Sequence, residues 1–318
     1  MTGTTSPRRI AASPPRRVVA TAPGKVNLSL RVGAADARGY HALATVFQAL
    51  DLVETVEARA VDGTDVRLSM DSRVGGNVPV DASNLAVRAA ELLRTEFAVS
   101  VGADLLITKR VPVAGGMAGG SADAAAALVA LNRLWGIDAS DADLRDLGAR
   151  LGADVPFALL GGTALGTGNG TTLDVLDAPA PLTWVLFAPG GELSTPEVFT
   201  AFDELAASTS TILTTQPRAD AAQIAALAAG DVPAIAATLA NDLEAPALQL
   251  RPDLAAHGAR LREAGALRVV VSGSGPTLAA LVRDREHADE VVDALGADAE
   301  RCTVSNGPAP GARIIDVE

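Results

Sequence analysis

The chain has 318 residues, of which 48% are hydrophobic and 3% aromatic, and its formal net charge is −12. This length allows two domains with sizeable cores, whereas the negative charge argues against nucleic-acid binding. No apolar run is long enough to span a bilayer, and the single cysteine, Cys302, excludes an internal disulfide. We therefore expect a cytoplasmic protein without a membrane segment.

The chain begins with a basic, proline-containing stretch, which we expect to form a disordered tail over residues 1–17. A short strand is predicted at 18–21, and a turn leads into a second strand at 22–30. In that second strand the period of two places Lys25 and Asn27 on one face. Such a face suits a strand that lines a cleft, although a solvated strand edge fits the pattern equally well.

Two residues beside a glycine turn, Tyr40 and His41, could bind a flat ligand by stacking and hydrogen bonding. From the pattern alone, a half-buried tyrosine with a solvent-exposed histidine is the more common arrangement. The chain also contains only two lysines, Lys25 and Lys109, in a background of arginine. Because lysine can bring a compact charge to a single oxygen, both are candidate site residues.

The stretch 111–127 places four glycines directly before an alanine-rich segment: Gly115, Gly116, Gly119 and Gly120. We expect a helix from Ala122 to Trp135 with Ser121 as its N-cap. A glycine loop before a helix exposes backbone N–H groups to an anion, which predicts a phosphate site; a flexible loop is the alternative. The spacing fits neither a Walker loop nor a dinucleotide-binding loop.

Asp154 lies in an otherwise apolar segment, two residues before Pro156. It could cap a short helix, since proline is tolerated in a first turn, or it could act as a catalytic base beside a cation. A glycine-rich segment at 160–170 is predicted to mark a domain boundary. Beyond it, we expect a helix that opens near Pro196 with Thr195 as its cap.

The remaining elements are read from hydrophobic periodicity. Strands are predicted at 46–60, 66–70, 104–109, 184–188, 268–271, 278–282 and 301–306. Helices are predicted at 81–97 (capped by Asp81 or Ser83), 140–151, 220–229, 231–240 and 252–264.

Three segments resemble the signature motifs of the GHMP small-molecule kinases: Pro23–Asn27, Pro112–Ala122 and Ser272–Thr277. Two others, 39–43 and 151–157, are similar to the members of that superfamily whose alcohol substrate carries a cytidine diphosphate. The resemblance covers essentially all of the chain after residue 17. It implies an α+β fold with a ribosomal-protein-S5-like domain at 18–168, a ferredoxin-like domain at 169–318, and a cleft between them.

The resemblance also implies an activity, the ATP-dependent phosphorylation of the 2-hydroxyl of a cytidine-diphosphate-linked methylerythritol in non-mevalonate isoprenoid synthesis, with Mg²⁺ expected beside ATP. By resemblance, Asp154 is the base that accepts the proton of the hydroxyl, and Lys25 holds the Asp154 carboxylate and the hydroxyl in place. The ATP phosphates would be held by the glycine loop, which consists of Pro112, Val113, Ala114, Gly115, Gly116, Met117, Ala118, Gly119, Gly120, Ser121 and Ala122.

Five residues match positions expected to hold the substrate: Asn27, Tyr40, His41, Thr195 and Phe199. Tyr40 and Phe199 would stack on the cytosine, while His41 would read its hydrogen-bonding edge. The third motif should bring its backbone close to the site without side-chain chemistry, through Ser272, Gly273, Ser274 and Gly275. The expected partner is a small molecule, and the expected assembly is a monomer or homodimer.

Two residues depart from the family's glycine loop. Ala118 stands where glycine is usual, and Asp123 stands where asparagine is common. Because a carboxylate that faced the site would repel phosphate, we expect Asp123 to point away or to help position a metal. The candidate protein ligand for Mg²⁺ is Ser121.

Two alternatives remain. One is another kinase of the same superfamily, acting on mevalonate, homoserine or a sugar. The other is a non-catalytic relative that binds its ligand as a sensor. The presence of both Lys25 and Asp154 argues against the sensor, which would need neither.

Overall fold

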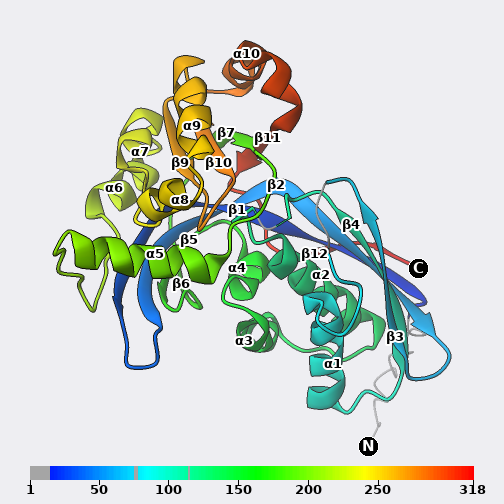
Figure 1. Cartoon of the computed structure of the whole chain (residues 1–318). Coiled ribbons are helices and arrows are strands. Elements are labelled where there is room, and N and C mark those ends of the chain that lie inside the picture. The colour runs from blue at the N-terminus through cyan, green and yellow to red at the C-terminus, as the bar shows by residue number, and fades with distance from the viewer. Residues whose placement is uncertain (1–14, 75–77, 114) are drawn as a thin grey trace, which may run out of the picture.

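The computed structural model describes residues 15–74, 78–113 and 115–318, so that most of the tail predicted at 1–17, and Ala114 of the loop, lie outside the described residues. The described strands form two sheets. Figure 1 shows the smaller sheet and its helices above the larger sheet, with helices α1–α4 below it. The protein is therefore an α+β structure, as the sequence predicts.

The large sheet is organised around two long antiparallel strands, β1 (Arg17–Ala35) and β2 (His41–Val61). The turn predicted after residue 21 is wrong, because β1 continues through Pro23. A register shift between Pro23 and Lys25 accommodates the residue that has no N–H for the ladder. Most of β1 is buried on both faces, so the solvated-edge alternative is wrong as well.

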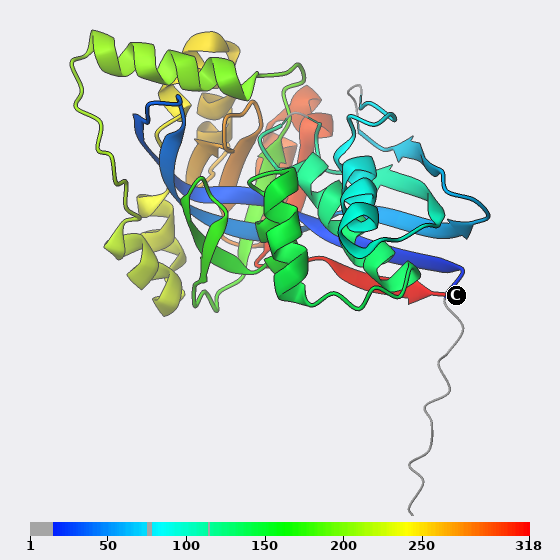
Figure 2. The ribbon, with the colours of Figure 1, turned by 90° about the horizontal axis from the view of Figure 1, so that it is seen from below.

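The strands of the large sheet follow the order β12-β1-β2-β4-β3, while β5 pairs with β2 and β6, and β8 pairs with β1. Their bounds are Val66–Ser72 (β3), Gly102–Lys109 (β4), Thr163–Gly168 (β5), Thr172–Val175 (β6), Ala240–Asn241 (β8) and Arg313–Val317 (β12). Figure 2 shows β12 running along the edge of the sheet, beside the start of β1.

Four helices cover this sheet: α1 (Leu85–Phe97), α2 (Gly119–Leu134), α3 (Asp141–Leu151) and α4 (Val155–Leu160). The alanine-rich helix α2 lies at the centre of their core, since small side chains let it approach the sheet and its helical neighbours closely. At α1 the predicted caps are wrong, because the Asn84 side chain accepts a hydrogen bond from the backbone N–H of Ala86.

The small sheet has the order β11-β7-β10-β9. Its strands are β7 (Leu182–Phe187), β9 (Arg268–Val271), β10 (Leu278–Val282) and β11 (Cys302–Gly307). The helices of this part are α5 (Thr195–Ser208), α6 (Ala221–Ala229), α7 (Val232–Thr238), α8 (Glu244–Leu250), α9 (Asp253–Glu263), α10 (Arg285–Ala294) and the 3₁₀ helix η1 (Gly296–Arg301).

An apolar cluster joins the two sheets. Val26 and Leu28 of β1 pack in it with Trp184 and Leu186 of β7. The Trp184 indole N–H donates to the Gln48 side chain of β2 at 3.0 Å. The division at residue 168 stays a prediction, and three strands that follow it in the chain, β6, β8 and β12, pair within the large sheet.

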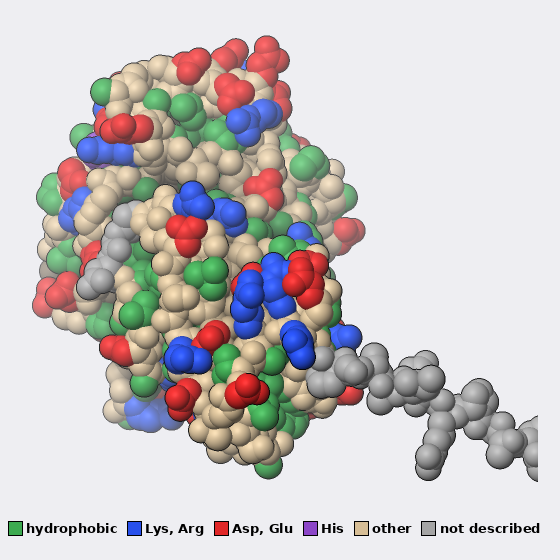
Figure 3. All heavy atoms as spheres, turned by 90° about the vertical axis from the view of Figure 1, so that its right-hand side faces the viewer, with side chains coloured by type: hydrophobic (Ala, Val, Ile, Leu, Met, Phe, Trp, Pro, Cys, Tyr) green, Lys and Arg blue, Asp and Glu red, His purple; other side chains and the backbone are tan. Residues whose placement is uncertain are grey.

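Charges of both signs are interspersed on the face shown in Figure 3. Ion pairs link neighbouring strands of the large sheet, among them Arg17–Glu57 at 2.8 Å and Arg67–Asp104 at 2.8 Å. None of the helices in the described part of the chain combines the length and apolar character needed to cross a bilayer.

Candidate active site

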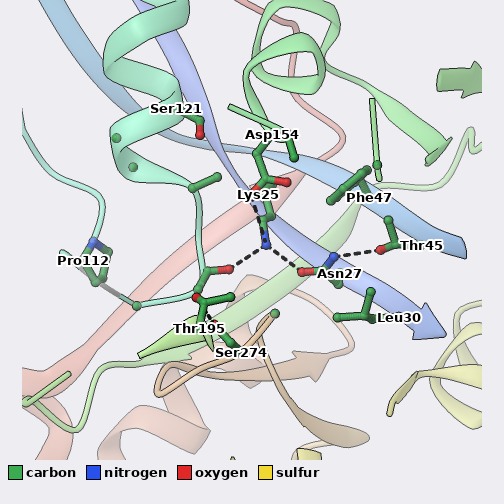
Figure 4. Close-up of a pocket in the computed structure, with 18 of the residues that line it drawn as sticks. Lys25, Asn27, Leu30, Thr45, Phe47, Pro112, Ser121, Asp154, Thr195 and Ser274 are labelled. Carbon is green, nitrogen blue, oxygen red and sulfur yellow. Dashed lines mark hydrogen bonds and ion pairs between the residues drawn. The ribbon is translucent and has the colours of Figure 1, made fainter. Parts of the chain in front are cut away.

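A cavity of about 480 Å³ lies where β1, the glycine loop and α5 meet the segment after β9. It is lined by residues of all three motifs and by the predicted base, among them Lys25, Asn27, Gly115, Gly116, Ser121, Asp154, Thr195, Phe199, Gly273 and Ser274. Figure 4 shows the side chains of Lys25, Asn27, Ser121, Asp154, Thr195 and Ser274 converging from separate elements. Segments far apart in the sequence thus form one concave site.

Lys25 projects from β1 into this cavity and is 5% exposed. Its ammonium donates to Asn27 Oδ1 and to the carbonyl oxygen of Gly116, both at 2.7 Å, and lies 4.0 Å from Asp154 Oδ2 (Figure 4). Burial lowers the pKa of Lys25 below its ordinary value, and the nearby Asp154 carboxylate opposes that shift. The Asn27 amide is oriented in turn by its donation to Thr45 Oγ1 at 2.8 Å.

Asp154 stands at the N-cap position of α4, but its side chain makes no capping hydrogen bond. A capping carboxylate accepts from the N–H of the second or third helical residue, and the second residue here is Pro156, which has none. The capping alternative is therefore wrong. The carboxylate, whose side chain is 31% exposed, is left free to face Lys25.

The glycine loop enters its helix earlier than predicted, since α2 begins at Gly119 rather than Ala122. The prediction of Ser121 as N-cap is wrong: Ala118 takes that position in a left-handed conformation, with φ 60° and no side-chain cap. Glycines 119 and 120 consequently form the first turn, whose N–H groups have no partner within the helix and are not screened by side chains of these two residues. Met117 is fully buried and anchors the loop in the apolar cluster between the sheets.

A buried ionic cluster lies beneath this first turn. Lys109 Nζ is 2.6 Å from Glu54 Oε1 and 2.8 Å from Asp123 Oδ2, and all three side chains are at most 2% exposed. Glu54 also accepts from the backbone N–H of Arg110 at 2.8 Å. Burial raises the pKa of Asp123 to about 7 and raises that of Glu54 too, while Lys109 opposes both shifts. Asp123 thus faces Lys109.

The sequence offered partial signals for this cluster. The scarcity of lysine singled out Lys109 as a candidate site residue, and in the structure it pairs with two carboxylates at the border of the cavity. Glu54 was missed, because it lies within a strand without a motif around it. No signal in one sequence connects it to residues 55 and 69 positions further on.

On the substrate side, Thr195 and Phe199 of α5 line the cavity. The prediction of Thr195 as the helix cap is wrong by one residue, because Ser194 accepts from the N–H of Glu197. Thr195 instead shares a 2.8 Å hydrogen bond with Ser274 Oγ. That contact links α5 to the third motif.

Tyr40 and His41 line a second, neighbouring cavity of about 670 Å³, which shares Asn169 with the first. Tyr40 is 69% exposed, whereas the His41 side chain is only 6% exposed, the reverse of the arrangement that the pattern favoured. Asp36 shapes the turn by accepting from the backbone N–H of Tyr40 at 3.0 Å. The His41 ring lies 5.0 Å from that of Phe199, so the two cavities meet at an aromatic contact.

The third motif approaches the glycine loop through both backbone and side chain. Gly273 lies so close that a Cβ there would stand 3.0 Å from the carbonyl oxygen of Gly116 and 3.1 Å from Lys25 Nζ. Ser272 Oγ donates to that same carbonyl oxygen at 3.1 Å. The serine side chains therefore take part in the contacts, in addition to the close backbone that the motif predicts.

Comparison with known proteins accounts for this geometry. The model of the GHMP kinases N terminal domain matches residues 84–162, and that of the GHMP kinases C terminal domain matches residues 223–301. A solved structure of 4-(cytidine 5'-diphospho)-2C-methyl-D-erythritol kinase is 34% identical, covers 91% of this chain and 98% of its own, and superposes with a TM-score of 0.72.

Two curated relatives are more similar in sequence. A 4-diphosphocytidyl-2-C-methyl-D-erythritol kinase from Nocardioides sp. is 48% identical over 92% of this chain and 98% of the relative. One from Leifsonia xyli is 46% identical over 92% of this chain and 97% of the relative. With both domain models matched and both relatives aligned almost end to end, the chain belongs to the GHMP kinases and, among them, to the 4-diphosphocytidyl-2-C-methyl-D-erythritol kinase family.

Proposed function

We propose that this protein transfers the γ-phosphoryl group of ATP to the 2-hydroxyl of 4-diphosphocytidyl-2-C-methyl-D-erythritol, giving the 2-phosphate and ADP in non-mevalonate isoprenoid synthesis. Family membership supports the substrate. The observation that carries the chemistry is the Lys25–Asp154 pair, held 4.0 Å apart in a cavity bordered by the glycine loop.

In this proposal Asp154 accepts the proton of the attacking hydroxyl. Its carboxylate is free of a capping bond and partly exposed to the cavity, so it can reach a substrate oxygen. Lys25, fixed by Asn27 and Gly116, offers its charge to the hydroxyl as negative charge develops there. Since phosphoryl transfer depends mainly on positioning and charge stabilisation, a base and a fixed cation supply what the acceptor side needs.

The ATP phosphates would bind at the first turn of α2, where Gly119 and Gly120 present backbone N–H groups at the positive end of the helix. The contact of Asp123 Oδ2 with Lys109 Nζ at 2.8 Å supports this, because the lysine charge offsets that of the carboxylate near the phosphates. Tyr40 and Phe199 would enclose the cytosine. In this proposal His41 reads the cytosine edge while its Nε2 keeps the contact with Asp203.

Mg²⁺ is part of the proposal as the companion of ATP. The described residues hold no group of three acidic, histidine or cysteine side chains that could enclose a metal ion. A single hydroxyl ligand fits nonetheless, since Mg²⁺ commonly keeps its waters and takes the rest of its ligands from substrate phosphates. Ser121, in the cavity beside the glycine turn, would be that ligand. When bound, the ion would neutralise phosphate charge.

We further propose that the enzyme acts in the cytoplasm as a monomer or homodimer on a small molecule. The single cysteine supports a reducing compartment. The net charge of −12 argues against nucleic acid as a partner.

A coupled ADP-release assay tests the function, with the cytidylated alcohol offered beside mevalonate, homoserine and galactose. We expect turnover with the cytidylated substrate only. In Asp154→Asn we expect ATP to bind while kcat falls by about 10²–10⁴-fold, the usual contribution of a positioned base. Asp146→Asn, the same charge change at an exposed position of α3, serves as the control.

Each other outcome has a distinct meaning. Near-wild-type turnover in Asp154→Asn would remove Asp154 from the role of base. Turnover with another alcohol would overturn the substrate but keep the chemistry. Binding of ATP without turnover of any alcohol would favour the alternative that the protein is a non-catalytic sensor.

A further inference from the structure

The helix α5 presents three residues at a spacing of four to the substrate side of the molecule: Thr195, Phe199 and Asp203. Residues at this spacing lie on one face of a helix. The first is hydrogen-bonded to Ser274 at 2.8 Å, and the last lies with Oδ2 at 3.3 Å from Nε2 of His41. Phe199 stands between these two contacts, so its ring is carried on a segment fixed at both ends.

The His41 ring is enclosed on several sides. Phe199 lies 5.0 Å away at a tilt of 31°, and Phe202 meets the ring edge-on at 5.9 Å and 80°. Nδ1 lies 2.7 Å from the carbonyl oxygen of Gly33, which can only accept, so Nδ1 carries a proton. Nε2 lies 3.3 Å from Oδ2 of Asp203, so the carboxylate faces the ring nitrogen that Gly33 does not contact.

We propose that Asp203 is a positioning residue, which holds the His41 ring against Phe199. These two rings form an aromatic wall between the two cavities, and Asp203 fixes that wall before the cytidine-bearing substrate arrives. The inference rests on the proposed function, since it assigns that wall to the cytosine. A wall that is already ordered costs less conformational entropy when the base binds. Asp203 is not among the residues that line the cavity around Lys25 and Asp154, so its effect should be confined to the cytidine end.

The chain offers a matched control in the next residue. Glu204 is exposed on the same helix turn and carries the same charge, but it does not pair with His41. We therefore compare Asp203→Ala with Glu204→Ala. The readouts are KM for the cytidylated alcohol, KM for ATP, kcat, and the Kd of CDP measured by calorimetry. Asp203→Glu tests rescue, because it restores the carboxylate on a longer side chain.

In Asp203→Ala we expect KM for the cytidylated alcohol and the Kd of CDP to rise about three- to five-fold, as befits a partly exposed ion pair. KM for ATP and kcat should stay within two-fold of wild type, because the variant leaves the Lys25–Asp154 pair and the glycine loop unaltered. Glu204→Ala should match wild type, and Asp203→Glu should recover part of the loss.

Equal effects of Asp203→Ala and Glu204→Ala, or an equal rise in KM for ATP, would overturn the role of Asp203, since either would mark a general effect on the helix. Failure of the wild-type protein to bind CDP or to phosphorylate the cytidylated alcohol would instead overturn the proposed function, and the assignment of the wall with it.

Discussion

The neighbours of Lys25 fix the position of its ammonium, and burial among them lowers its pKa. Its ammonium is buried, donates to Asn27 and Gly116, and faces Asp154 across 4.0 Å. Two neutral acceptors and one carboxylate compensate only in part for the lost hydration, which is why burial governs the direction of its pKa shift. A lysine in this setting gives up its proton more readily than one in water.

This shift predicts the alkaline side of the pH–activity profile. As the pH rises through the lowered pKa of Lys25, the charge that faces Asp154 is lost. We therefore expect kcat to begin to fall at a pH below 10.5, the ordinary pKa of lysine. In Lys25→Arg the guanidinium stays charged, and we expect a lower kcat without that alkaline limb. Stopped-time ADP assays across the alkaline range measure both profiles. The same limb in both proteins would assign it to another group.

At this scale the sequence indicates well which single residues line the cavity when a motif surrounds them, as with Lys25 and Asp154. It does not indicate Glu54, whose partner Lys109 lies in another strand and whose surroundings in the sequence are ordinary. The pattern also favours a solvent-exposed His41, because it gives no sign that Phe199 and Phe202 enclose the ring. Burial that arises from distant segments is not a local property.

Among the elements, the glycine loop and the segment after β9 fit together with little room. Gly116 has φ +73°, and a Cβ on it would stand 1.9 Å from the carbonyl oxygen of Ser272. The two segments come from different parts of the chain, so this position must remain a glycine for both conformational and steric reasons.

Gly116→Ala should therefore disturb the site more than a substitution at a left-handed glycine that has open space around it. We expect kcat/KM to fall on the order of ten-fold or more, since the displaced carbonyl of Gly116 also holds Lys25. Gly136→Ala is the matched control: its φ is +63°, but its Cβ would meet open space. It should lose about 1 kcal/mol of stability and keep its activity. Equal losses of activity in both variants would contradict the steric argument.

The sequence predicts the existence of these elements better than their ends. The helix after the glycine loop was expected from composition, but its start depends on Ala118 in a left-handed conformation, which alanine seldom adopts. Thr195 and Ser194 are both good caps by type, and only the contact of Thr195 with Ser274 separates them. Tertiary contacts thus decide among local choices of nearly equal energy.

For the whole molecule, the last strand completes the first sheet. β12 pairs with β1 between Val18 and Thr21, and Arg17 forms ion pairs with both Glu57 and Asp316. Sequence patterns identified the α+β class and the motif order, but not this pairing. Residues at opposite ends of a chain carry no periodicity that relates them.

Removal of residues 313–318 should lower stability more than activity. We expect a loss on the order of 2 kcal/mol, from a few ladder hydrogen bonds of about 1 kcal/mol each, which corresponds to a fall in Tm of roughly 3 °C. Ile315→Ser, at a half-exposed side chain of the same strand, keeps the backbone ladder and is the control. Thermal unfolding followed by circular dichroism measures both. An unchanged Tm in the truncated protein would show that β1 needs no partner at this edge.

One oxygen atom, the carbonyl of Gly116, accepts from Lys25 of the large sheet and from Ser272 beyond the small one. Assembly of the two sheets and readiness of the ammonium are for this reason a single event. A chain in which the two sheets have not packed together lacks this oriented ammonium beside Asp154. Conditions that separate the sheets should therefore release Lys25 from the site before either sheet unfolds.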